Sequence, residues 1–139
     1  MSEAKIGGAA KNRRPLSPHL QVYTPLVNMV MSIIHRLTGV ALYAGTILLA
    51  WWLTAVAVGQ DYFDFVSGIF ASWPGKIVLL GYTWALIHHG LGGIRHFIWD
   101  TGRGYDLDTV DKLSWGTLIG SLLLTGLVWM AALNPGVGG

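Results

Sequence analysis

The sequence predicts an all-α membrane protein built on three transmembrane helices. Hydrophobic residues make up 53% of the 139 residues and charged residues 12%, which is about half of the ~25% that is typical of soluble domains. With a mean hydropathy of +0.51, the chain has too few polar side chains to cover a soluble globule. It also contains long runs without Asp, Glu, Lys or Arg, and roughly 20 apolar residues are enough for a helix to cross a hydrocarbon core of about 30 Å.

The first two spans are predicted at residues 29–58 and 74–99. Residues 37–60 are free of charged side chains, and in residues 77–94 only His88 and His89 interrupt the apolar run. Ser72 and Pro74 mark the start of the second span, because a serine N-cap followed by proline in the first turn is typical of helix beginnings. Between the two spans, residues 61–65 form a short acidic and aromatic segment that predicts an interfacial loop.

The third span is predicted at residues 113–133. We expect its helix to begin near Asp111, since a carboxylate is favourable at the positive end of a helix dipole, and to end before the Asn134-Pro135-Gly136 breaker. Residues 101–105 precede it as a turn-rich polar loop. The chain thus divides into an N-terminal tail, residues 1–28, and a membrane anchor domain, residues 29–139.

The distribution of Lys and Arg predicts the orientation. The tail carries four such residues and the second loop two, whereas the first loop has Lys76 alone and the C-terminus none. We therefore expect the tail in the cytoplasm and the C-terminus in the periplasm. The first apolar run is too long and too late for a cleavable signal peptide, and the short tail contains Glu3, which favours a bacterial inner membrane over a mitochondrial one.

Several classes of function are excluded by composition. Without cysteine the chain has no disulfide, no thiolate metal site and no covalent haem attachment. A formal net charge of +2 and the lack of a basic stripe argue against binding of nucleic acid.

Two polar clusters lie within or beside the spans, where ionisable side chains are costly and indicate function. The first cluster, at the start of span one, contains Ser32, His35 and Arg36; the second, at the end of span two, contains His88, His89, Arg95, His96 and Asp100. Because the first span enters and the second returns at the same membrane face, we expect the two clusters to converge near the cytoplasmic side.

The spacing in the second cluster suits a haem b that stands upright in the bundle. His89 and His96 share one helix face roughly 10.5 Å apart, so iron at His89 would put the propionates level with His96, Arg95 and His35. Neutral imidazole is a usual ligand of b-type haem iron. His88 lies about 100° away around the helix and is expected to be structural or lipid-facing. The second axial ligand is left open: a partner subunit, no ligand at all, or His35.

Three segments, in order, carry a resemblance to a known family: Arg14–Tyr23, Ser32–Gly39 and His89-x5-Arg95-His96-x3-Asp100. Together they resemble the cytochrome b subunit of succinate dehydrogenase (complex II), the larger of its two membrane anchors, over residues 13–105. The resemblance implies a flavoprotein subunit that oxidises succinate, an iron–sulfur subunit, and a second, smaller anchor that completes the helical bundle. It further implies one haem b between the two anchors and a ubiquinone site near the iron–sulfur subunit.

The resemblance also implies roles for individual residues. It gives His89 as the haem iron ligand, with the second ligand from the smaller anchor, and His35, Arg95 and His96 as propionate contacts. Ser32 and Arg36 would bind ubiquinone: Arg36 can stabilise the negative charge that develops on a reduced quinone in a low-dielectric site, and Ser32 can hydrogen-bond to a carbonyl oxygen. Neither donates protons readily, so a partner side chain, water or Asp100 would do so.

The chain is not expected to catalyse a reaction alone. Two alternatives remain open at this point. The first is an anchor of a quinol:fumarate reductase that works in the opposite direction. The second is a non-redox membrane scaffold or transporter subunit, in which the buried charges only pair with neighbouring side chains.

Overall fold

The computed structural model describes residues 24–134, and all regular structure in this range is helical. Its helices are α1 (Val27–Val58), α2 (Gln60–Ala71), α3 (Trp73–Asp100) and α4 (Leu107–Leu133). Three of them, α1, α3 and α4, are long and apolar enough to cross a membrane. The all-α membrane class is therefore confirmed. The tail segment Arg14–Tyr23 lies outside the described residues.

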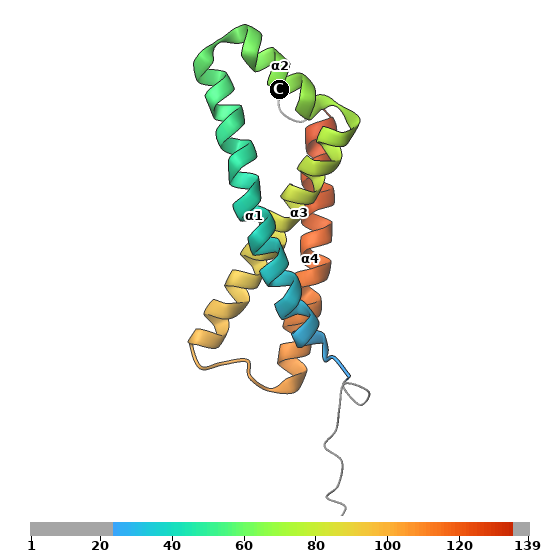
Figure 1. Ribbon diagram of the computed structural model, residues 1–139. Coiled ribbons are helices and arrows are strands. Elements are labelled where there is room, and N and C mark those ends of the chain that lie inside the picture. Colours follow the sequence, from blue (N-terminus) through green and yellow to red (C-terminus); the bar gives the residue numbers. More distant parts are fainter. Residues whose placement is uncertain (1–23, 135–139) are drawn as a thin grey trace, which may run out of the picture.

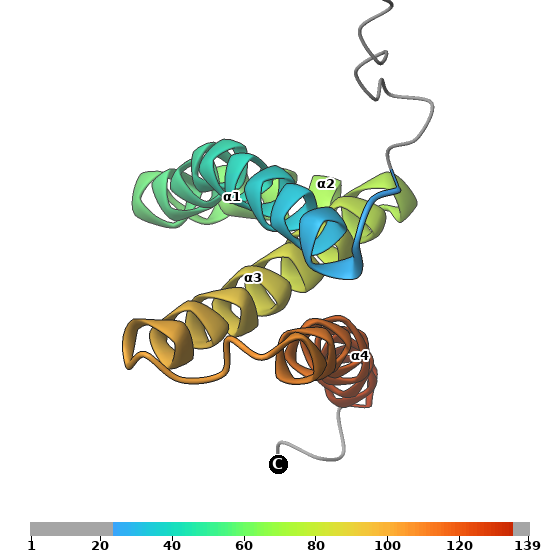
Figure 2. The same cartoon turned by 90° about the horizontal axis from the view of Figure 1, so that it is seen from below.

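The three long helices run up, down and up, and α3 lies between the other two. Figure 1 shows α1 and α3 crossing near their middles, and Figure 2 shows α1 and α4 on opposite sides of α3. Contacts link α3 both to α1 and to α4. The side chains of α3 therefore divide between two interfaces.

The segment between the first two spans is a helix, so the expectation of a loop was wrong. α2 closes the end of the bundle at which α1 and α3 diverge (Figure 1). It is joined to α1 through Gly59, whose φ of +137° is readily adopted only by glycine. On α2, Val66 is buried, and the Tyr62 hydroxyl accepts a 2.9 Å hydrogen bond from Trp51 Nε1 of α1. Aromatic packing against α1 thus stabilises a short amphipathic helix.

The beginnings of α3 and α4 are both set by capping side chains. Ser72 caps α3 by accepting a hydrogen bond from the Gly75 amide at 3.3 Å, as its sequence position indicates. Asp106 caps α4 by accepting from the Thr109 amide at 3.0 Å. α4 therefore begins at Leu107, earlier than the expected start near Asp111.

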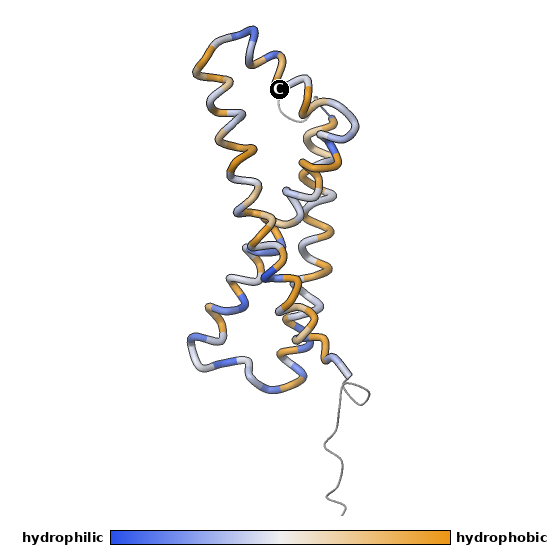
Figure 3. Tube along the Cα trace, viewed as in Figure 1, coloured by the Kyte–Doolittle hydropathy of each residue, from blue (hydrophilic) through white to orange (hydrophobic). Residues whose placement is uncertain are grey.

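Polar and apolar side chains are distributed as in a membrane protein. The hydropathy colouring in Figure 3 is apolar along the long helices and polar where α3 is connected to α4 and around the α1–α3 crossing. Among the described residues, the buried side chains include seven polar or charged ones: Thr38, His88, Arg95, Ser114, Thr117, Ser121 and Thr125. Such side chains pack inward because hydrocarbon offers them no hydrogen-bond partner.

Candidate functional site

The candidate site lies where α1 and α3 cross, and two glycines allow the close approach. A Cβ on Gly39 of α1 would lie 3.1 Å from His89 Cε1, and a Cβ on Gly92 of α3 would overlap the His35 imidazole. Each glycine therefore leaves space for a histidine ring from the opposite helix. By contrast, a Cβ on Gly93 would meet no atom within 4 Å.

Three histidines gather at this crossing, as the sequence predicts. The rings of His35 and His89 are stacked, with centroids 4.0 Å apart and planes at 16°. The rings of His35 and His96 meet edge to face at 5.3 Å. His96 is exposed, whereas Nε2 of His35 is buried and has no hydrogen-bond partner among the described residues.

The contacts of His89 assign its tautomer. Its Nδ1 lies 3.2 Å from the carbonyl oxygen of His35 and 3.3 Å from Thr38 Oγ1. A carbonyl oxygen can only accept, and the Thr38 hydroxyl already donates to the same carbonyl at 2.9 Å, so Nδ1 carries the proton. The lone pair of His89 is then on Nε2, the state in which a histidine can ligate a metal while its other nitrogen donates to the backbone.

Ser32 and Arg36 lie on α1, between the crossing and the N-terminal end of that helix. They are four residues apart on one helix face. Ser32 is half-buried and Arg36 is exposed. The guanidinium group of Arg36 forms no salt bridge with any residue in the 24–134 range.

Arg95 is level with the histidines, but it faces α4. It is only 3% exposed, its Nη1 donates to Ser114 Oγ at 3.1 Å, and its guanidinium carbon lies 5.2 Å from the centre of the Trp99 ring. Its Nε is buried without a partner in the described part of the chain. This nitrogen is therefore a hydrogen-bond donor that still lacks an acceptor.

His88 is structural and does not face lipid. Its side chain is 0% exposed, its Nδ1 lies 3.2 Å from Ser121 Oγ of α4, and its ring packs 5.1 Å from that of Trp84. A large ligand could reach this imidazole only by separating α3 from α4. His89 is thus the accessible member of the pair.

The sequence prediction missed the hydroxyl partners that α4 supplies. Ser114, Thr117, Ser121 and Thr125 recur at three- and four-residue intervals in a charge-free span and are all buried. This spacing puts them on one helix face. The pattern was visible in the sequence as a signal for a polar helix interface.

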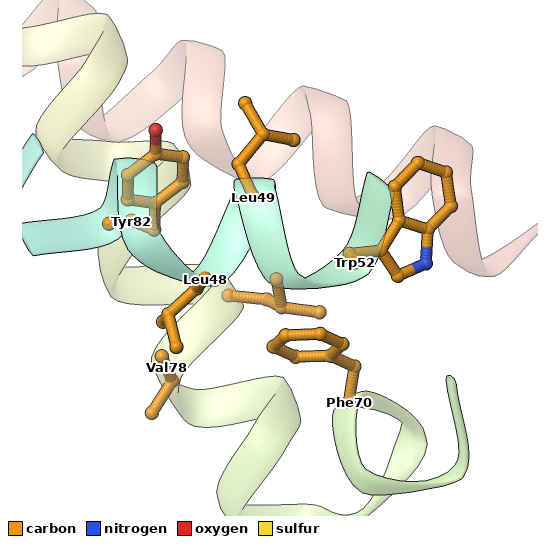
Figure 4. A pocket seen from close by; sticks show the side chains of 8 residues that line it. Leu48, Leu49, Trp52, Phe70, Val78 and Tyr82 are labelled. Atoms are coloured by element: carbon orange, nitrogen blue, oxygen red, sulfur yellow. The ribbon is translucent and has the colours of Figure 1, made fainter. Parts of the chain in front are cut away.

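An apolar groove extends from the histidine cluster along α1 and α3. Its volume is about 850 Å³, and its lining includes Thr38, Ala41, Tyr82 and Ala85. It continues into a smaller cavity of about 260 Å³, where Figure 4 shows Tyr82 and Val78 of α3, Phe70 of α2, and Leu48, Leu49 and Trp52 of α1 around the space. Thr38 links the groove to the His89 imidazole.

Comparison with known proteins shows the family of the chain. Residues 10–128 match the family described as succinate dehydrogenase/fumarate reductase transmembrane subunit. The chain is 41% identical to the succinate dehydrogenase cytochrome b556 subunit of Paracoccus denitrificans, over 84% of this chain and 90% of that protein. It is 36% identical to the cytochrome b556 subunit of Rickettsia prowazekii, over 91% and 98%.

A mitochondrial relative is also similar. The succinate dehydrogenase cytochrome b560 subunit of Sus scrofa is 32% identical, over 88% of this chain and 72% of that protein. The resemblance seen in the sequence is thereby confirmed. The chain belongs to the succinate dehydrogenase/fumarate reductase transmembrane subunit family, and within it to the cytochrome b subunits of succinate dehydrogenase.

Proposed function

We propose that this chain binds haem b and forms part of the ubiquinone-reduction site of a succinate:quinone oxidoreductase. The observation that carries the proposal is the state of His89, whose Nδ1 donates to the His35 carbonyl and whose Nε2 keeps its lone pair. The relatives named as cytochromes b support the same reading. Haem b, when bound, supplies a one-electron carrier within the membrane.

The residues at the crossing fit such a group. His89 would ligate the iron, and His35, His96 and Arg95 would contact the propionates. His35 Nε2 is buried at the crossing without a partner among the described residues, and a propionate carboxylate would satisfy it. Arg95 Nε also lacks a partner there, but its side chain packs against α4, so it would have to turn toward the crossing to reach a propionate. The groove beside Thr38 offers apolar walls for the macrocycle.

The second axial ligand is proposed to come from the smaller anchor subunit. His35, the candidate within this chain, has its ring stacked nearly parallel to His89 at 4.0 Å. Because the His35 ring packs directly on the His89 ring, no haem would fit between the two, so His35 would not serve as the second ligand. The stacking therefore supports a ligand from a partner.

Ser32 and Arg36 are proposed to bind ubiquinone. Reduction builds negative charge on the quinone oxygens, and a guanidinium such as that of Arg36, which has no counter-ion among residues 24–134, can stabilise that charge in a site of low dielectric. The exposed Arg36 side chain supports this role. Ser32 can hydrogen-bond to a quinone carbonyl, and the protons come from Asp100, a partner or water.

The proposal includes the other subunits and the membrane. A flavoprotein subunit would oxidise succinate, an iron–sulfur subunit would pass on its electrons, and the smaller anchor would complete the bundle. We place the chain in a bacterial inner membrane with its N-terminus in the cytoplasm, which the Lys and Arg distribution supports.

The test uses the detergent-purified complex that is isolated through a tag on this chain. A reduced-minus-oxidised absorption spectrum of the wild type should show a b-type band, and His89→Ala should lose or shift it. Arg36→Ala should lower succinate:quinone activity by at least about tenfold while succinate still reduces an artificial dye.

Two results would contradict the proposal. A wild-type complex without a b-type band would remove the haem assignment. Equal loss of the dye and quinone activities in Arg36→Ala would favour the scaffold alternative, because that reading ties Arg36 to assembly and not to quinone reduction.

A further inference from the structure

The interface between α3 and α4 is held by a polar seam, defined here as Trp84, His88 and Arg95 of α3 with Ser114 and Ser121 of α4. These two serines bind side chains of α3. The remaining buried hydroxyls of α4 do not cross the interface: Thr117 donates to the Leu113 carbonyl and Thr125 to the Ser121 carbonyl, each at 2.7 Å.

Ser121 uses its entire hydrogen-bonding capacity in the seam. Its hydroxyl donates to the Leu118 carbonyl at 2.8 Å, so both of its lone pairs accept. Trp84 Nε1, which can only donate, lies 3.2 Å away, and His88 Nδ1 also lies 3.2 Å away. A hydroxyl offers one proton and two lone pairs, and all three are engaged. With the Ser121 proton on the Leu118 carbonyl, His88 Nδ1 is the donor to Ser121 Oγ.

A second contact lies two helical turns away. Arg95 is seven residues after His88 on α3, and its partner Ser114 is seven residues before Ser121 on α4. Because the two helices are antiparallel (Figure 1), both contacts belong to the same register. A helix attached at two such points cannot rotate or slide without breaking a hydrogen bond, and lipid provides no replacement partner.

We infer that His88 and Ser121 act as positioning residues for the haem ligand His89. The inference rests on the proposed haem-binding function. Adjacent residues on a helix point about 100° apart, so a rotation that freed His88 from α4 would also turn His89 away from the His35 carbonyl. The two neighbouring histidines thus have different tasks: His88 fixes the rotation of α3, and His89 presents its Nε2 to the iron.

The experiment compares single-hydroxyl deletions in the purified complex. Ser121→Ala removes the acceptor that Trp84 and His88 share, whereas the matched control Thr125→Val removes a buried hydroxyl of the same seam face that bonds only within α4. The readouts are the electron paramagnetic resonance g values of the oxidised haem, its midpoint potential, and haem retention. We expect Ser121→Ala to shift the g values and the potential, with haem retention weakened by up to about tenfold. Thr125→Val should match the wild type.

Variants at His88 keep the inference testable if Ser121→Ala does not assemble. The amide of His88→Asn can donate from near the position of Nδ1 and should preserve the wild-type g values, while His88→Leu should shift them. Wild-type g values and potential in Ser121→Ala, or equal shifts in His88→Asn and His88→Leu, would overturn the inference. A wild-type complex without haem would instead refute the proposed function.

Discussion

At the scale of single residues, the histidine pair shows what a sequence can and cannot specify. The convergence of His35, His89 and His96 follows from their matched depth in antiparallel spans, and the structure brings their rings together. The choice of Ser121 as the partner of His88 does not follow, because it depends on how α4 is rotated. A charge-free run such as 113–133 leaves that rotation undetermined unless its hydroxyl spacing is considered.

A pair of adjacent glycines tests the close approach at the crossing. Gly92→Ala should destabilise the protein by about 1–3 kcal/mol, because the new methyl group would overlap the His35 ring and overpacking has costs of this size. Gly93→Ala is the control, since its methyl group would meet no atom within 4 Å. Thermal unfolding of the purified complex, followed by circular dichroism, should give a lower melting temperature for Gly92→Ala than for Gly93→Ala. Equal melting temperatures would mean that α1 and α3 are not held in close contact.

At the scale of helices, the three spans could be predicted, but two features at their ends could not. The 12-residue α2 is too short for its apolar face to be distinguished from an interfacial loop, and it is stabilised by contacts with α1 that the sequence does not reveal. The start of α4 was placed near Asp111 because a carboxylate is favourable at the positive end of a helix dipole. Only the hydrogen bond to Thr109 identifies Asp106 as the cap.

This cap makes the first turn of α4 sensitive to acid. Hydrogen bonds from the Thr109 hydroxyl and amide lower the pKa of Asp106 below its ordinary value of 3.8. In the unfolded chain the Asp106 carboxylate therefore binds a proton more tightly than in the native protein. The stabilisation of the helix by this cap is complete above the ordinary pKa of 3.8 and is lost as the pH falls through the lowered pKa. Protection of the Thr109 amide from hydrogen exchange, corrected for intrinsic rates, should therefore decrease at about pH 3 relative to pH 6.

Two substitutions at the cap serve as controls. Asp106→Asn caps without titrating, so its protection should be the same at both pH values. Asp106→Ala should have low protection at both. If the wild type and Asp106→Asn responded equally to acid, the titrating group would have to be another one.

At the scale of the whole molecule, the distribution of side chains is that of a protein embedded in apolar surroundings. Large apolar side chains cover its outer faces, and the polar ones lie between helices. The number of spans followed from the charge-free runs of the sequence. The central position of α3 could not be predicted in this way. The order of helices in a bundle is decided by side-chain contacts, such as those of His88 and Arg95, and a run of apolar residues does not encode these contacts.

The orientation of the molecule in the membrane can be tested with reporter fusions. If the tail and the second loop lie in the cytoplasm, as the Lys and Arg distribution predicts, alkaline phosphatase fused after Gly139 should be active in a bacterial host and green fluorescent protein fused there should be dark. Fusions truncated after Gly102, in the loop between α3 and α4, should give the reverse pattern. Fluorescence at the C-terminus would invert the topology and place the histidine cluster at the other membrane face.

The junctions of α1, α2 and α3 turn these helices into a closed triangle. Its corners are Gly59, Ser72 and the crossing at Gly39 and His89 (Figure 1). A triangle of stiff rods, unlike an open hinge, cannot change one angle unless one side changes length. α2 thus determines how far apart α1 and α3 stand along the groove. The angle at which the histidines meet is therefore set in part by α2, a short helix at the other end of the bundle.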